Sequence, residues 1–159
     1  MAILSILEKQ IQAKQLYSQD GQTPVVKPII LVAEDHDDSR SMLKQLLETW
    51  GYSVVEATNG EEAVRLAELE HLDLILMDVR LPLLDGFAAA RQIRQFSPPD
   101  QVPIVFLSAH AERSYLSQAQ KIGAADYLIK PMGLTQLENT LLKHLKKPIR
   151  QNVLRLVKF

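Results

Sequence analysis

Short apolar runs alternate with longer amphipathic segments along residues 28–147 of this 159-residue chain. Five runs have the length and composition of strands, at 29–33, 53–57, 72–77, 103–108 and 126–130. Three of them are almost wholly apolar instead of alternating, which is typical of strands that are covered on both faces. The pattern therefore predicts a parallel sheet between two layers of helices.

The segments between the runs have the periodicity of helices. Before Gly51, apolar residues recur at i, i+3, i+4 and i+7, namely at Leu43, Leu46, Leu47 and Trp50. Similar spacing predicts four more helices. The first opens at Asn59-Gly60, and the second contains Phe87, Ala90 and Ile93. The third covers about 112–122 before Gly123, and the fourth contains Leu134, Leu137, Leu141 and Leu145. Five strand–helix units predict an α/β domain with a doubly wound parallel sheet over about 28–147.

Two segments of different composition flank this domain. The polar stretch 18–28 predicts a linker, so residues 1–27 are an N-terminal extension and linker. Upstream, Leu4, Leu7 and Ile11 share one helical face. The simplest interpretation is that this stripe packs on the domain or frays, and a partner-binding helix is the alternative. Residues 148–159 are a C-terminal tail that is too short to bury a core of its own.

Composition and charge exclude several classes of protein. With 18 basic and 19 acidic residues the net charge is −1, which gives no bulk attraction to nucleic acid or to an anionic membrane. The absence of cysteine excludes a disulfide scaffold and thiolate metal sites. No apolar run approaches the ~20 residues of a membrane span, and the N-terminus lacks the basic segment of a signal peptide. We therefore expect a cytoplasmic protein without a nucleic-acid or membrane partner.

Charged and polar residues stand where the predicted strands end. Glu34 and Asp35 follow the first strand, and Asp78 follows the third. Ser108 and Lys130 end the fourth and fifth strands. Because the carboxyl ends of parallel strands meet at one edge of a sheet, these five residues should converge on one crevice.

Three clustered carboxylates repel one another, and a hard divalent cation would remove the repulsion. Mg²⁺ fits best, because it takes one or two carboxylates, keeps several waters and is shared with a phosphate. A lone phosphoryl group fits better than a nucleotide, because no Gly-rich loop follows any predicted strand. One acid could then accept the phosphoryl group as an aspartyl phosphate. Lys130 would neutralise phosphate oxygens, and Ser108 would donate a hydrogen bond to another.

Four motifs, "AEDHDDSR", "ILMDVRLPLLDG", "IVFLSA" and "GAADYLIKP", resemble those of the response-regulator receiver domain of two-component signalling. The resemblance covers about residues 28–147 and is to a stand-alone, chemotaxis-regulator-like receiver. It implies a flavodoxin-like fold, in which five parallel strands in the order 2-1-3-4-5 are surrounded by five helices.

The resemblance also implies a role for each acid of the site. In that family the aspartate of the third strand accepts phosphate from a histidine kinase, a role that falls to Asp78. The metal-site acids would be Glu34 and Asp35, which hold Mg²⁺ together with Asp78 and the backbone carbonyl of Arg80. Lys130 would be the lysine that binds the phosphate.

A switch is implied in the same way. Ser108 would be the switch hydroxyl, in a position where the family often has threonine, and Tyr127 would be the switch aromatic. The Lys130-Pro131 bond would be cis, which only proline makes at low cost. Arg80 and His110 occupy the variable positions that tune the lifetime of the phosphoryl group, and they leave that lifetime open.

Several of these residues also have simpler interpretations. Asp37 and Asp38 are interpreted as acids that cap and favour the N-terminus of the first helix. His36 is interpreted as a solvated loop histidine, because no second His or Cys lies near it in the sequence as a metal partner. Taken alone, Lys130 would be a strand-end lysine with its charge in water, and Tyr127 a packed aromatic. The neighbouring acids favour the functional role of Lys130, and only the resemblance favours that of Tyr127.

The favoured function is a signalling module that is phosphorylated on Asp78 by a histidine kinase or a histidine phosphotransfer protein. Its output would be the binding of a downstream protein, or of a second copy, through the fourth helix, fifth strand and fifth helix. One alternative is a Mg²⁺-dependent phosphohydrolase, which would need a general acid two positions after its nucleophile, where Arg80 stands. Another is a phosphorylation-independent adaptor, which the intact five-residue set disfavours. We therefore expect no enzyme beyond a module that assists its own phosphorylation and dephosphorylation.

Overall fold

The structure is a computed structural model that describes residues 26–98 and 101–145. The predictions for the N-terminal extension, for most of the linker and for the tail concern residues outside these ranges. Within them, no helix is long and apolar enough to cross a membrane.

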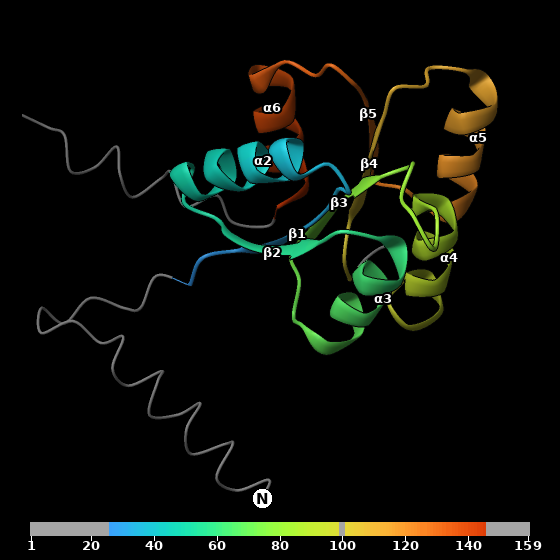
Figure 1. Cartoon of the computed structure of the whole chain (residues 1–159), viewed down its shortest axis with the longest axis horizontal. Helices are drawn as coiled ribbons and strands as arrows, with labels where there is room; N and C mark the ends of the chain where they lie inside the picture. The colour runs from blue at the N-terminus through green and yellow to red at the C-terminus, as the bar shows by residue number, and fades with distance from the viewer. Residues whose placement is uncertain (1–25, 99–100, 146–159) are drawn as a thin grey trace, which may run out of the picture.

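Five parallel strands form one sheet in the order β2-β1-β3-β4-β5, as predicted (Figure 1). They are β1 (Ile29–Ala33), β2 (Ser53–Ala57), β3 (Leu74–Asp78), β4 (Ile104–Ser108) and β5 (Asp126–Ile129). β3 begins at Leu74 and not at residue 72. Just before it, Asp73 donates its backbone N–H to the carbonyl of Ile29 at 2.8 Å, and its Oδ2 accepts the N–H of Ile29 at 2.7 Å.

The helices in the described residues alternate with the strands and form two layers. They are α2 (Asp37–Thr49), α3 (Gly60–Leu69), α4 (Gly86–Phe96), α5 (Arg113–Ile122) and α6 (Leu134–His144). One face of the sheet packs on α3, α4 and α5, and the other packs on α2 and α6. Successive residues of β3 alternate between these layers: Ile75 and Met77 face the first, whereas Leu74 and Leu76 face the second. The doubly wound sheet predicted from the apolar runs is therefore confirmed.

Helix termini agree with the sequence at most positions. The side chain of Asn59 accepts the N–H of Glu62 at the start of α3, and Gly123 ends α5 with a φ of 81°. The prediction that Asp37 and Asp38 cap the first helix is wrong. His36 holds the cap position without a side-chain cap bond, and both aspartates lie inside the first turn. There their negative charges interact favourably with the positive end of the helix dipole. Asp37 also accepts a hydrogen bond from the guanidinium of Arg40.

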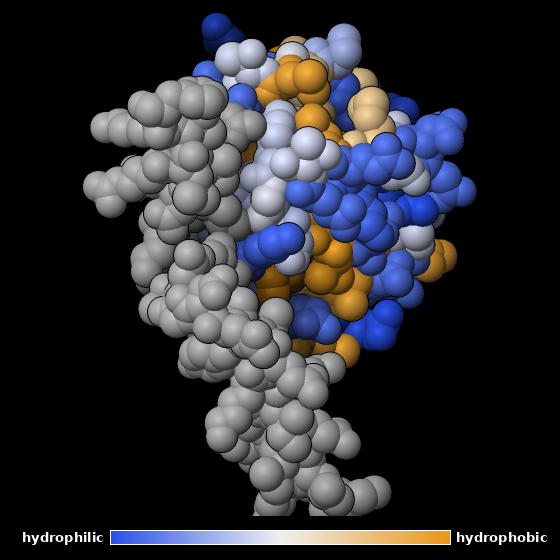
Figure 2. Space-filling model, turned by 90° about the vertical axis from the view of Figure 1, so that its left-hand side faces the viewer, coloured by the Kyte–Doolittle hydropathy of each residue, from blue (hydrophilic) through white to orange (hydrophobic). Residues whose placement is uncertain are grey.

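The surface is mostly hydrophilic, but hydrophobic side chains form patches between the charged ones on the face shown in Figure 2. Large apolar side chains that are well exposed in the described residues include Met42 on α2, at 63%, and Leu134 on α6, at 61%. Scattered apolar residues are ordinary on a protein surface, whereas neighbouring ones indicate a contact site.

Gly86 lies close to the end of β3, and this close approach predicts a stability effect. A Cβ at this position would lie 2.0 Å from the carbonyl oxygen of Asp78, whereas at Gly133, which caps α6, nothing lies within 4 Å. We expect Gly86→Ala to lower the free energy of unfolding by about 1–3 kcal/mol, because the end of β3 must shift. Gly133→Ala should lower it by only about 0.5 kcal/mol, the ordinary loss of a glycine cap. Urea unfolding of both variants gives the comparison, and equal losses would contradict it.

Candidate functional site

Strand pairing brings the predicted residues to one edge of the sheet. Asp78 is the last residue of β3 and pairs with Leu107 of β4, next to Ser108. Ser108 in turn pairs with Ile129 of β5, next to Lys130. Glu34 follows β1 directly and is held there by its backbone N–H, which donates to Ala57 at 3.0 Å. The convergence expected from the strand ends is therefore present.

Two buried carboxylates share one ammonium group at this edge. Glu34 is 2% exposed and Asp78 is 7% exposed. Nζ of Lys130 donates to Oε2 of Glu34 at 2.7 Å and also to Oδ2 of Asp78. Burial alone would lower the pKa of Lys130, but its hydrogen bonds to Asp78 and Glu34 outweigh burial and raise it. The lysine is therefore cationic at neutral pH and holds the two acids side by side.

Backbone groups fix the other oxygen of each acid. Oδ1 of Asp78 accepts the N–H of Arg80 at 2.7 Å, and Oε1 of Glu34 accepts the N–H of His36 at 3.1 Å. Each acceptor lies two residues before its donor, so the loop that follows the strand turns back over the strand end. The orientation of both carboxylates is thus set by local chain geometry as well as by Lys130.

One positioning residue, Arg40, was not identified from the sequence. Its side chain is 12% exposed, and its guanidinium donates to the backbone carbonyl of Glu34 at 3.0 Å. Its Nε also lies 3.4 Å from a carboxylate oxygen of Glu56 on β2. Arg40 therefore ties the loop after β1 to α2 and to the edge strand. The spacing of three residues between Asp37 and Arg40 could have indicated their ion pair, but not the contacts of Arg40 with Glu34 and Glu56.

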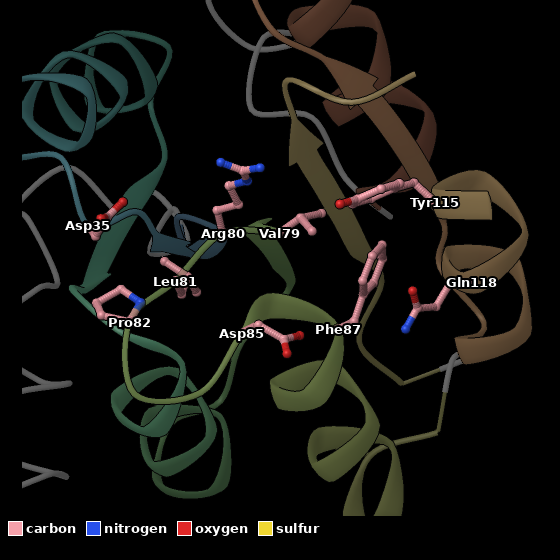
Figure 3. A pocket seen from close by; sticks show the side chains of 9 residues that line it. All are labelled: Asp35, Val79, Arg80, Leu81, Pro82, Asp85, Phe87, Tyr115 and Gln118. Carbon is pink, nitrogen blue, oxygen red and sulfur yellow. The ribbon is translucent and has the colours of Figure 1, made fainter. Parts of the chain in front are cut away.

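A cleft of about 490 Å³ opens beside the acids (Figure 3). Asp35 lies on one side of it, and Tyr115 and Gln118 of α5 lie across from it. Arg80 and Asp85 belong to the loop that lines it between β3 and α4. A molecule in this cleft would thus contact the exposed acid and the loop directly after Asp78.

The acids of the loop after β1 offer a set of ligands for a metal ion. Ligand atoms of Glu34, Asp35 and His36 lie within 4.8 Å of one another. Oxygen-rich sets of this kind suit Mg²⁺ better than softer metals. The His36 side chain is 81% exposed, in agreement with a solvated histidine, and its Nδ1 is 4.0 Å from Asp35. Asp78, the third predicted acid, is connected to this group through Lys130.

Ser108 and Tyr127 are linked through a single residue of the loop after β4. Oγ of Ser108, which is 1% exposed, accepts the N–H of His110 at 3.1 Å. The hydroxyl of Tyr127 donates to the carbonyl of that same His110 at 2.8 Å. Burial raises the pKa of Tyr127, so the hydroxyl stays protonated as a donor. The imidazole of His110 stacks on Tyr115 with 4.6 Å between ring centroids.

The Lys130-Pro131 bond is cis, as the resemblance implied. This bond lies directly after the ammonium group that bridges Glu34 and Asp78. The expectation about the backbone at the end of β5 is therefore confirmed, whereas the roles of the individual site residues stay predictions.

The chain is similar in sequence to curated regulatory proteins. The transcriptional regulatory protein PdtaR of Mycobacterium tuberculosis is 41% identical over 109 residues, which are 68% of this chain and 52% of PdtaR. The chain spans about a quarter to a half of the length of the curated relatives it matches.

Solved structures give the same result. The receiver domain of the sensor histidine kinase PA1611 from Pseudomonas aeruginosa, with a magnesium ion in its active-site cleft, is 35% identical with a TM-score of 0.70, over 77% of this chain and all of that one. The receiver domain of Saccharomyces cerevisiae Ssk1, solved with the histidine phosphotransfer protein Ypd1, is 33% identical with a TM-score of 0.69, over 74% of this chain and 88% of that one.

The model of the response regulator receiver domain matches residues 30–142, which are most of the chain and contain all five strands except Ile29, the first residue of β1. This chain belongs to the response-regulator receiver-domain family of two-component signalling.

Proposed function

We propose that this chain receives a phosphoryl group on Asp78 and thereby switches a protein-binding surface. The observation that carries the proposal is the bridge of Lys130 between Asp78 and Glu34, two buried acids at the carboxyl edge of the sheet. Membership of the receiver family supplies the reaction class, and the bridge supplies an acid that is already paired with the cation needed by its phosphorylated form.

The phosphoryl donor is a histidine kinase or a histidine phosphotransfer protein. The complex of the Ssk1 receiver with Ypd1 supports this donor class. An oxygen of the Asp78 carboxylate forms the new P–O bond while the P–N bond to the donor histidine breaks, and the imidazole nitrogen keeps the electron pair. Lys130, already beside Asp78, then neutralises phosphoryl oxygens as a compact point charge.

Mg²⁺ is the cofactor of this reaction, and the magnesium ion in the PA1611 receiver supports it. Glu34, Asp35 and Asp78, with the backbone carbonyl of Arg80, are the residues that would hold the ion. When bound, the ion offsets the negative charge that gathers on the transferring phosphoryl group. Within this set of ligands, Asp35 is exposed to solvent and Glu34 is buried and held in place.

The phosphohydrolase alternative receives no support from the loop after β3. A hydrolase would need a general acid close to its nucleophile, and Arg80, whose N–H binds Asp78, has a guanidinium that does not release its proton at neutral pH. A phosphorylation-independent adaptor would have no need for two buried acids bridged by a lysine. The cytoplasmic location expected from the sequence stays a prediction.

The proposed output surface is the face formed by α5, β5 and α6, which are the fourth helix, fifth strand and fifth helix of the sequence prediction. Leu116 on α5 and Ile129 on β5 are 40% and 41% exposed on these elements. Movement of the Ser108 hydroxyl toward a phosphoryl group would release the N–H of His110. The carbonyl of the same residue holds the Tyr127 hydroxyl, so the change would reach β5 through one peptide segment. The partner is a downstream protein or a second copy of the chain.

Asp78 should be the phosphoacceptor. With acetyl phosphate and Mg²⁺, intact mass should show a single increment of ~80 Da, as a covalent acyl phosphate requires. Asp78→Asn should show none, because an amide oxygen is a poor nucleophile. Asp85→Asn is the matched control: Asp85 lines the same cleft and caps α4, so its variant should keep the increment. An equal increment in Asp78→Asn would remove the assignment.

Mg²⁺ should bind before any phosphoryl group is present. Asp35→Ala should weaken Mg²⁺ binding by about tenfold or more, or about 1.4 kcal/mol, and slow phosphorylation with it. Asp38→Ala should change little, because Asp38 lies in the first turn of α2 and is exposed. A titration monitored by amide chemical shifts measures both variants. Equal effects would mean that the first helical turn, and not the loop after β1, holds the ion.

Phosphorylation should reach the face of α5, β5 and α6. Beryllofluoride, a phosphoryl mimic, should change amide chemical shifts around residues 108–130 and into α6, because Ser108 and Tyr127 share His110. Tyr127→Phe removes the hydroxyl that donates to this residue and should shorten the range of the changes beyond β5. Changes confined to the residues around the acids in the unsubstituted chain would show that the switch does not operate.

A further inference from the structure

An apolar groove of about 390 Å³ lies between α2 and α6, on the face of the sheet opposite to α3, α4 and α5. We call it the α2–α6 groove. Its apolar lining is Met42, Leu43 and Leu46 from α2 and Pro131, Met132, Leu134 and Leu137 from the start of α6 and the loop before it. Met42 and Leu134, one on each wall, are the best exposed of these side chains, at 63% and 61%. Neighbouring exposed apolar residues of this kind indicate that something covers them.

Charged residues accompany the apolar lining. Asp38, which is exposed in the first turn of α2, is four residues before Met42 and so lies on the same helical face. Glu34 and Lys130 also line the groove. An occupant should therefore have an apolar face for the lining, and positive charge would suit the acid beside it.

Residues 146–159 have this composition. They contain five Lys and Arg and no Asp or Glu, whereas residues 26–145 contain 11 basic and 17 acidic residues, a formal net charge of −6. Ile149, Val153, Leu156 and Val157 are spaced i, i+4, i+7 and i+8, which places them on one face in a helical conformation. Arg150 lies next to this face, and Arg155 and Lys158 lie on the opposite side. Pro148 is favourable at the first position of such a helix.

The position of this segment in the chain also suits the groove. It follows α6, and α6 itself forms one wall. Twelve residues, 148–159, would extend about 18 Å as a helix, and the 11 residues of α6 extend about 16 Å. A turn after α6 would thus let the segment run back along the groove as far as the start of α6. The N-terminal extension suits it less well, because residues 1–25 contain two basic and two acidic residues and have no net charge.

We propose that residues 148–159 dock in the α2–α6 groove, with Ile149, Val153 and Leu156 against its lining and the basic residues toward the acidic surface of the domain. The docking does not depend on the proposed function. The second copy of the chain and the N-terminal extension are the competing occupants.

Paramagnetic relaxation in the full chain tests the docking without any phosphorylation. The chain has no cysteine, so Gln151→Cys provides a single site for a nitroxide label on the polar side of the segment. The label should remove most of the amide signal intensity of Met42, Leu46, Met132 and Leu134, and leave α3 and α4 unchanged. Arg150→Glu with Arg155→Glu and Lys158→Glu, added to the labelled chain, should restore most of the lost intensity, because residues 26–145 carry a net negative charge.

Two matched samples identify the occupant. A label at Gln12→Cys in the N-terminal extension should leave the groove signals intact, and a loss equal to that from Gln151→Cys would overturn the proposal in favour of the extension. A mixture of isotope-labelled chain without nitroxide and nitroxide-labelled chain without isotope should also show no loss, and a loss there would mean that a second copy fills the groove. Groove signals that keep their intensity in the Gln151→Cys chain would overturn the docking itself, whatever Asp78 does.

Discussion

The ammonium group of Lys130 between Glu34 and Asp78 is the interaction on which the site depends. Each of these acids is almost fully buried, and the effective penalty for burying an unpaired charge is several kcal/mol. One cation offsets part of the penalty for both. With Asp35 added, the formal charges are three negative and one positive, so the edge of the sheet keeps an attraction for a divalent ion. The pairing is thus sufficient to let the domain fold and insufficient to neutralise the site.

The same arrangement supports the proposed role of Asp78. A phosphoryl group there would add negative charge next to an ammonium group that is already in place, so little rearrangement of Lys130 would be required. The N–H of Arg80 fixes the second oxygen of Asp78, and the close approach of Gly86 to the Asp78 carbonyl fixes its backbone. These two backbone contacts therefore position Asp78 without a second side chain from β3. This agrees with a module in which the partner supplies the histidine.

Sequence periodicity predicted the sheet, its layers and the converging residues, because each of these follows from local patterns joined by one geometric rule about parallel strands. The errors had two sources. Asp37 and Asp38 appeared to be caps from composition alone, but α2 begins at Asp37 and His36 holds the cap position, and composition does not determine a helix boundary to one residue. Arg40 itself was missed, since its contacts with Glu34 and with Glu56 on β2 connect residues whose proximity only the fold determines.

The connection from Ser108 to Tyr127 shows what a switch of this size can do. Both of its hydrogen bonds use the backbone of His110, one through the N–H and one through the carbonyl. A net hydrogen bond contributes about 1 kcal/mol, and a tenfold change in a two-state equilibrium requires about 1.4 kcal/mol. In the proposed switch, the loss or gain of one such bond would therefore shift a two-state equilibrium at Tyr127 by less than tenfold. A larger response would need a further contribution, from the charge of a phosphoryl group or from the binding of a partner. Bonds of this size thus favour a graded shift that is completed by binding over an all-or-none change within the domain.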